Sequence, residues 1–432
     1  MMDGLNIRED KGILLPGLAL KKVIDGMQEF VDLPAQENSL YFTFKEKLEK
    51  LEDLDDATRE ELLSDTEKQI IERVYPAYQL MIDYFKSLES KVTDDHGVWK
   101  FPNGDEFYAY MLKNHTTTNY TPEQVHNIGL SEVARIDLEM REILDGLDFP
   151  NDSSIGYYID SLSKDAKYLF PNNDEGRAAA IAEYERLITE ISNNLDDVFD
   201  VRPKAAVEVR RVPEFREKTA AGAYYNAPAM DGSRPGIFFA NLRDMNEIIQ
   251  WGMATLAYHE AVPGHHFQIA IQRELEGLPT FRTVLPFTAY SEGWALYAER
   301  LAWEYGFHED PLTNLGRLQA EQFRAVRLVV DTGIHFKRWT RDQAIKFMRE
   351  HTGMPLGEVI TEIERYIVTP GQACAYKIGM MKILELREKA RSVMGENFDI
   401  REFHNVILKN GSMPLEILEQ VVEQYISEGA IS

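Results

Sequence analysis

The chain has 432 residues, of which 44% are hydrophobic and 28% are charged, so it is long enough to bury a large core. Its net charge of −25 disfavours nucleic acid or an anionic membrane as a partner, because both bind basic surfaces. The single cysteine, Cys374, excludes an intrachain disulfide framework. No apolar run approaches the roughly 18 residues needed to cross a membrane, so we expect no membrane span.

The first half of the chain has a helical pattern. We predict an amphipathic helix over Leu18–Val31 and helical structure between residues 44 and 92, with a helix start at Ser64 and a kink at Pro76. A turn-rich connector follows at Thr93–Glu106. Beyond it, helices are predicted over Phe107–Asn114, Thr121–Leu147 and Glu175–Val198.

Between residues 204 and 241 the pattern changes to that of a sheet. Ala206–Val212 alternates with a period of two, Gly236–Asn241 is rich in strand formers, and Gly222–Pro228 lies between them, which predicts about three strands. From Leu312 to Ser427 the pattern is helical again. We therefore predict one mainly α domain with a small β-sheet (α+β) over residues 1–432. It comprises a helical part (1–203), the sheet with the metal-site helices (204–310) and a second helical part (311–432).

The residues suited to chemistry concentrate in Tyr258–His266, which holds three of the ten histidines and one glutamate. A His-Glu pair at the end of an apolar helical run is the first half of the zinc-peptidase signature, in which two histidines bind the metal and the glutamate is the general base. The spacing departs from the simple signature. On an unbroken helix, His265 would point about 120° away from His259, and His266 would lie roughly 10 Å further along the axis.

Pro263 and Gly264 offer a way to bring the histidines together. Proline lacks the backbone donor and clashes with the carbonyl four residues back, and glycine adopts conformations closed to other residues. We predict that they kink or bulge the helix and place His265 beside His259, with His266 as the alternate ligand. For an isolated His-Glu pair, a helix that ends and surface histidines would be the more common interpretation, but residues downstream favour a metal site.

A catalytic zinc site with two histidines needs a third protein ligand and one open position. The helical pattern of Tyr290–Leu301 carries Glu292 in its first turn and Glu299 on about the same face. We therefore predict Zn as the cofactor, held by His259, His265 and Glu292. Glu299 is predicted to orient one of the ligand histidines. In isolation, the two glutamates would be interpreted as solvated groups on an amphipathic helix.

Several motifs, in order, resemble one bacterial family. They are His259–Gln268, Ser291–Glu299, Arg327–His335 and the stretch from Arg365 through Pro370–Gly379. Over essentially the whole chain the sequence resembles the "domain of unknown function 885" family, which is grouped with gluzincin-type metallopeptidases. The resemblance implies a helical zinc-metallopeptidase-like fold with a deep central cleft. The start of the chain resembles the family's interior. We expect a cytoplasmic protein for the chain as given, and an extracytoplasmic one if an N-terminal segment is missing.

The resemblance also implies a zinc-dependent hydrolase that cleaves peptide bonds of small peptides, as carboxypeptidases or oligopeptidases do, with Glu260 as general base. Tyr376 and His335 are the candidates to stabilise the oxyanion, and Tyr224 and Tyr225 are candidates from the sheet. A C-terminal carboxylate of the substrate would need a cation, for which the candidates, each more commonly a structural ion-pair partner, are Arg234, Arg327, Arg365 and Lys377. An edge strand near residues 236–241 is a candidate to pair with extended substrate.

Two alternatives stay open. One is a catalytically inactive, peptidase-like binding protein, although Glu260 argues against it because a metal clip needs no base. The other is a metal-dependent amidase or esterase that uses the same site on a different substrate. The sequence predicts a small peptide as the partner and leaves the oligomeric state undetermined.

Overall fold

The protein is described from a computed structural model, which describes residues 2–218 and 220–429. The chain divides into two compact units. Unit 1 comprises Met1–His96 and Lys100–Asn103, and unit 2 comprises Gly97–Trp99 and Gly104–Ser432. No helix in the described part of the chain combines the length and the apolar character needed to span a membrane.

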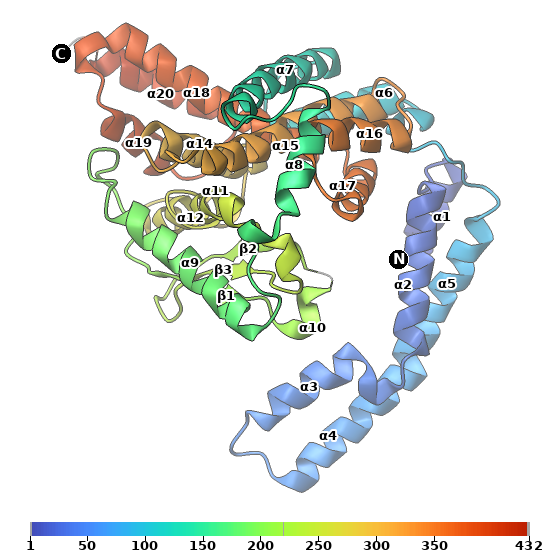
Figure 1. Cartoon of the computed structure of the whole chain (residues 1–432). Coiled ribbons are helices and arrows are strands. Elements are labelled where there is room, and N and C mark those ends of the chain that lie inside the picture. Colours follow the sequence, from blue (N-terminus) through green and yellow to red (C-terminus); the bar gives the residue numbers. More distant parts are fainter. Residues whose placement is uncertain (1, 219, 430–432) are drawn as a thin grey trace. The chain divides into compact units, whose positions relative to one another are not determined.

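Unit 1 is helical in its described residues (Figure 1). Its helices are α1 (Met2–Asp10), α2 (Gly17–Asp32), α3 (Ser39–Glu49), α4 (Asp56–Gln69) and α5 (Tyr75–Leu88). The predicted helix start at Ser64 is wrong, because Asp55 caps α4 by accepting a hydrogen bond from the Thr58 N–H at 2.9 Å. Pro76 lies in the first turn of α5, where proline is tolerated, and a π-helical turn at Ile70–Val74 precedes it. Helices α2 and α5 pack together through a small apolar core.

Unit 2 contains most of the helices and the sheet. Its helices are α6 (Gly104–Thr116), α7 (Pro122–Gly146), α8 (Ile155–Ser163), α9 (Asp174–Ser192), α10 (Glu214–Glu217), α11 (Met253–Glu260), α12 (His265–Glu274), α13 (Thr280–Val284), α14 (Thr288–Glu304), α15 (Pro311–His335), α16 (Arg341–Thr352), α17 (Leu356–Val368), α18 (Ala375–Met394), α19 (Ile400–Leu408) and α20 (Leu415–Gly429). Helix α15 packs along α7, and α14 packs along α18. The predicted helices at residues 107–114, 121–147 and 175–198 correspond to α6, α7 and α9, whereas α8 was not predicted.

The sheet has three strands, β1 (Val207–Arg211), β2 (Ala223–Asn226) and β3 (Gly236–Ala240), in the order β1-β3-β2. Strand β3 runs parallel to β1 and antiparallel to β2. The three predicted strands are therefore confirmed, as is the mainly α fold with a small sheet. The predicted edge strand is wrong: β3 is the middle strand and is paired on both sides, so the open edges belong to β1 and β2.

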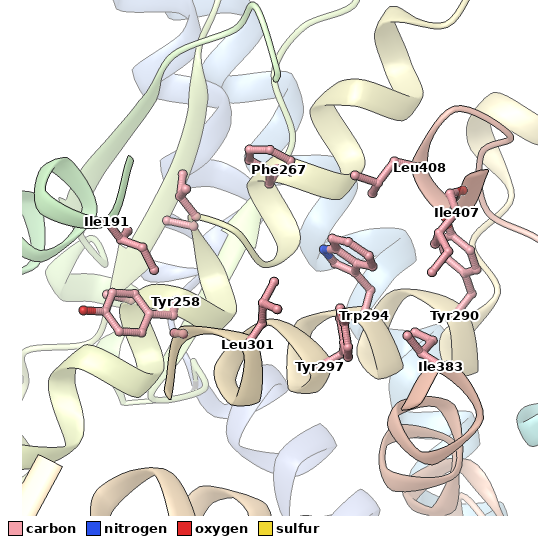
Figure 2. Close-up of a cluster of buried hydrophobic side chains, with 14 of the residues drawn as sticks. Ile191, Tyr258, Phe267, Tyr290, Trp294, Tyr297, Leu301, Ile383, Ile407 and Leu408 are labelled. Atoms are coloured by element: carbon pink, nitrogen blue, oxygen red, sulfur yellow. Dashed lines mark hydrogen bonds between the residues drawn. The ribbon is translucent and has the colours of Figure 1, made fainter. Parts of the chain in front are cut away.

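Aromatic side chains of α14 form the centre of the unit 2 core (Figure 2). Trp294 shares this core with Phe267 of α12, and its indole N–H donates to the Pro263 carbonyl at 2.8 Å. The hydroxyl of Tyr290 donates to the Ile407 carbonyl at 2.9 Å. Buried tryptophan and tyrosine need such partners for their polar atoms. This core fixes α14, and with it the side chains on the opposite face of that helix.

Candidate metal centre

The helix that carries the His-Glu pair stops and a second helix begins. Helix α11 ends at Glu260, Ala261 leaves the helical conformation with φ −111° and ψ −98°, and α12 begins at His265. A Cβ atom on Gly264 would lie 1.9 Å from the His259 carbonyl oxygen, so only glycine fits where the chain folds back on the end of α11. The Val262–Pro263 peptide bond is cis. The predicted disruption at Pro-Gly is thus a complete break between two helices.

Three side chains converge at this break. The ring centroids of His259 and His265 are 4.7 Å apart. Oε2 of Glu292, from the first turns of α14, lies 3.6 Å from Nε2 of His259 and 3.3 Å from Nε2 of His265. One ligand atom from each of the three residues lies within 4.8 Å of the other two, so the group can hold a metal ion. Two imidazoles and one carboxylate are a common ligand set of catalytic metal sites.

Glu299 sets the tautomer of His259. Its carboxylate accepts a hydrogen bond from Nδ1–H of His259 at 2.6 Å, which turns Nε2 toward Glu292. Oε2 of Glu292 is buried and makes no hydrogen bond with any described residue. A neutral imidazole nitrogen and a carboxylate oxygen are both acceptors, so a cation between them would satisfy both. The chemistry of this donor set therefore fits a divalent metal ion.

The pKa values of His259 and Glu292 are also consistent with a cation site. Burial opposes the charged form of His259, but the carboxylates of Glu292 and Glu299 outweigh it and raise the pKa of His259 to about 9. Burial also opposes ionisation of Glu292, but the neighbouring His265 and His259 outweigh it and hold the pKa of Glu292 well below its usual value. In the metal-free protein, a proton on His259 thus balances the charge of Glu292. A metal ion would have to displace that proton.

Glu260 is the last residue of α11 and follows the ligand candidate His259 directly. It is buried, with 7% of its surface exposed. Burial, and then the negative charge of Glu260, raise the pKa of Tyr184, which places this tyrosine of α9 near the carboxylate. Glu260 forms no hydrogen bond or ion pair with any residue in the described ranges. Its carboxylate is therefore available to exchange a proton with a bound molecule.

His266 faces away from this group. Its Nε2–H donates to the Ala205 carbonyl at 3.1 Å, and its Nδ1 accepts from the Tyr225 hydroxyl at 2.9 Å. Both ring nitrogens of His266 thus form hydrogen bonds on the sheet side of unit 2. The hydroxyl of Tyr225, a predicted substrate-binding residue, is one of these two partners. The hydroxyl of Tyr224 is buried without a hydrogen-bond partner, and its ring stacks on Phe239 with centroids 5.0 Å apart. Of the two candidate histidines, His265 is the one beside His259 and Glu292.

Tyr376 lies close to the third ligand candidate. Helices α14 and α18 cross tightly, because a Cβ atom on Gly379 would lie 1.9 Å from the Ala289 carbonyl oxygen. The crossing brings the first turn of α18 near the first turn of α14. Burial, and then the negative charge of Glu292, raise the pKa of Tyr376. The Tyr376 hydroxyl therefore stays protonated near neutral pH and can donate a hydrogen bond.

Three other predicted site residues have partners of their own. Nδ1 of His335 accepts from the Val98 N–H at 3.2 Å, and its Nε2–H donates to the Tyr366 carbonyl at 2.9 Å. The guanidinium of Arg365 pairs with Glu362 at 2.9 Å and donates to Gln372 at 2.7 Å. The ammonium group of Lys377 pairs with Glu321 at 2.6 Å and with Glu132 at 2.8 Å. None of these contacts involves the three metal-ligand candidates.

Sequence reasoning missed one residue, Arg324. Helix α15 packs against α11, and the positive charge of Arg324 is among the effects that lower the pKa of His259. The spacing could have indicated it. Arg324 precedes the predicted substrate-binding residue Arg327 by three positions, about one helical turn, so the two side chains lie on about the same face of the helix.

Comparison with known proteins assigns the chain to a family. Residues 2–422 match the family described as "Bacterial protein of unknown function (DUF885)". A crystal structure titled as a "putative lipoprotein" from Colwellia psychrerythraea is 40% identical, with a TM-score of 0.94, and the match covers 98% of this chain and 72% of that one. A "putative lipoprotein of unknown function" from Shewanella oneidensis has the same fold, at 22% identity and a TM-score of 0.73, with 93% of this chain and 73% of that one covered.

A search of curated proteins finds no match. The family match spans almost the entire sequence, including the helices that carry His259, His265 and Glu292. The chain therefore belongs to the DUF885 family of bacterial proteins.

Proposed function

We propose that this protein is a zinc-dependent hydrolase that cleaves peptide bonds of small peptides. The observation that supports this function best is the convergence of His259, His265 and Glu292, with the buried Glu260, which pairs with no described residue, next to His259 in the chain. Three protein ligands leave one position of a tetrahedral ion open, as catalytic zinc sites require. Zinc in such a site supplies Lewis-acid chemistry, because it polarises a carbonyl oxygen and makes water more acidic.

Three residues of the chain have the other roles in the proposed reaction. Glu260 accepts a proton from the attacking water on a carboxylate oxygen and later donates it to the leaving amine. Glu299 holds Nδ1–H of His259 and so keeps Nε2 turned to the ligand position. The Tyr376 hydroxyl donates to the oxyanion that develops on the substrate carbonyl.

An open strand edge supports a peptide as the substrate. Strand β2 packs against α11, and one of its edges is free because it pairs only with β3. An extended peptide can add to such an edge through main-chain hydrogen bonds. We propose β2 for this role.

The titles of the two similar structures bear on location. Both proteins are described as "putative lipoproteins". We extend this description to a proposal that the present protein acts outside the cytoplasm.

The test combines metal analysis with a peptide digest. Protein purified without chelators should contain about one zinc per chain and should cleave members of a peptide library, with products identified by mass spectrometry. The variant Glu260→Gln should keep the metal and lose activity by about 10²- to 10⁴-fold, because the general base is gone. Glu276→Gln, at an exposed residue beyond the end of α12, is the matched control and should behave as wild type.

The proposal fails if the protein binds no metal and if its activity is unaltered by chelators and by Glu260→Gln. If the protein cleaves amides or esters and leaves peptides intact, the proposed metal site stands and the proposed substrate class is wrong.

A further inference from the structure

Two arginines on α15 lie close to the same aromatic ring. The guanidinium carbon of Arg324 is 5.3 Å from the Phe323 ring centroid, and that of Arg327 is 4.0 Å from it. The two residues are about one helical turn apart, and α15 packs against α11, the helix of His259 and Glu260. The two side chains differ in how their charges are balanced.

Arg327 is held firmly and has one nitrogen to spare. Its Nε–H donates to the Tyr366 hydroxyl at 2.8 Å, and its Nη2 pairs with Glu362 at 3.1 Å. Its guanidinium also lies over the ring of Tyr376, 4.5 Å from the centroid. Only 7% of the side chain is exposed, and its buried Nη1 has no hydrogen-bond partner among the described residues. A rigid guanidinium thus has an unused donor beside the tyrosine that neighbours Glu292.

Arg324 has no acidic partner among the described residues. Within the described residues its one hydrogen bond runs from Nη1 to the Ala320 carbonyl of its own helix, at 3.2 Å, and its buried Nε has no partner there. The chain has 72 acidic and 47 basic residues, so a shortage of carboxylates does not explain this. Arg324 lies on α15, which packs against α11, the helix of His259 and Glu260. A cation without an acidic partner among the described residues therefore lies on a helix that contacts one of the metal-site helices.

We propose that Arg324, together with the unused Nη1 of Arg327, binds the C-terminal carboxylate of the peptide substrate. Unpaired buried donors are costly, and an anion that accepts their hydrogen bonds removes this cost. The planar fork of a guanidinium matches a carboxylate in two places. This inference rests on the proposed function and narrows it: the substrates are peptides with a free C-terminus, cut close to that end.

The test uses three forms of one short peptide: the free acid, its C-terminal amide, and an amide whose last residue is aspartate. Wild-type protein should prefer the free acid over both amides by about 10- to 100-fold in kcat/KM, the range expected for a charge-assisted hydrogen bond. Arg324→Gln should lose most of this preference, mainly through a higher KM for the free acid. Arg324→Lys, which keeps the charge, should retain part of the preference.

Arg349→Gln, at an exposed arginine of α16, is the matched control and should keep the full preference. Equal cleavage of acid and amide by the wild type would overturn the inference and leave the proposed function intact. Equal preference for the acid and the aspartyl amide would also overturn it, because a side-chain carboxylate would then suffice.

Failure of the proposed function can be recognised separately. If the wild type cleaves none of the three peptides, the hydrolase proposal is contradicted, and calorimetric binding of the same peptides still decides the inference. Tighter binding of the free acid that depends on Arg324 would support it. Equal binding of acid and amide would overturn it.

Discussion

The indole N–H of Trp294 donates to the carbonyl oxygen of Pro263 at 2.8 Å, and this bond joins the turn between the two metal-site histidines to the helix of the third ligand candidate. Trp294 is completely buried in the core of unit 2 and lies two positions after Glu292 on α14. Packing of the core therefore sets the position of the turn relative to Glu292. The histidines, which flank the turn, are fixed by the same contact.

The fit of Gly264 gives a prediction about stability. Gly264→Ala should destabilise the protein by about 1–3 kcal/mol, because its Cβ would lie 1.9 Å from the His259 carbonyl oxygen and the turn would have to move. Metal affinity should fall as well, since the turn positions both histidines. The control is Gly357→Ala in α17, where a Cβ meets nothing within 4 Å and a small gain in stability is expected. Chemical denaturation and metal titration measure both effects, and equal behaviour of the two variants would contradict the prediction.

Glu299 offers a test of ligand orientation. Glu299→Gln should keep the fold and lower metal affinity by about 10- to 100-fold, because the amide is a weaker partner for Nδ1–H of His259 than a carboxylate. The matched control is Asp174→Asn, whose side chain is 97% exposed at the start of α9. Competition with a metal-binding dye gives the affinities. Unchanged affinity in Glu299→Gln would show that the carboxylate does not orient the ligand.

The raised pKa of His259 predicts opposite pH trends for stability and metal binding. In the metal-free protein, protonated His259 contributes stability that is full below the unfolded pKa of about 6.5 and is lost as pH rises through about 9. A metal ion needs the neutral imidazole, so metal affinity should rise with pH, by at most about tenfold per unit, until about pH 9. Melting curves of the metal-free protein and titrations in metal buffers test both trends. A flat affinity profile between about pH 7 and about pH 9 would contradict this assignment.

Features fixed by neighbouring residues could be predicted from the sequence. The three strands follow from local alternation, and the disruption between His259 and His265 follows from Pro263 and Gly264. The grouping of both histidines with Glu292 was predicted from ligand chemistry, and their ligand atoms do lie together. These inferences needed only residue type and spacing.

Features that depend on distant partners could not be predicted in the same way. Local alternation predicts strands but not their order, so the sequence places β3 at an edge, whereas β3 pairs with both β1 and β2. Both ring nitrogens of His335 form hydrogen bonds with backbone groups of Val98 and Tyr366, and no local sequence pattern predicts these contacts. Arg324 stands out only in the structure, where it pairs with no acid among the described residues and its buried Nε has no hydrogen-bond partner there.

Lys377 gives the sharpest contrast between a structural and a substrate-binding role. Its side chain is 1% exposed and pairs with Glu321, which is 3% exposed. Lys377→Met should destabilise the protein by about 3 kcal/mol, because the loss of one partner leaves the carboxylate of Glu321 less compensated in the interior.

Lys389→Met, on the same helix, removes a half-exposed cation paired with Glu423 and should cost at most about 1 kcal/mol. Denaturant titration measures the free energies of unfolding. At a temperature where both variants are folded, each should hydrolyse peptides with the wild-type KM. A higher KM for Lys377→Met with unchanged stability would instead place the ammonium group in contact with substrate.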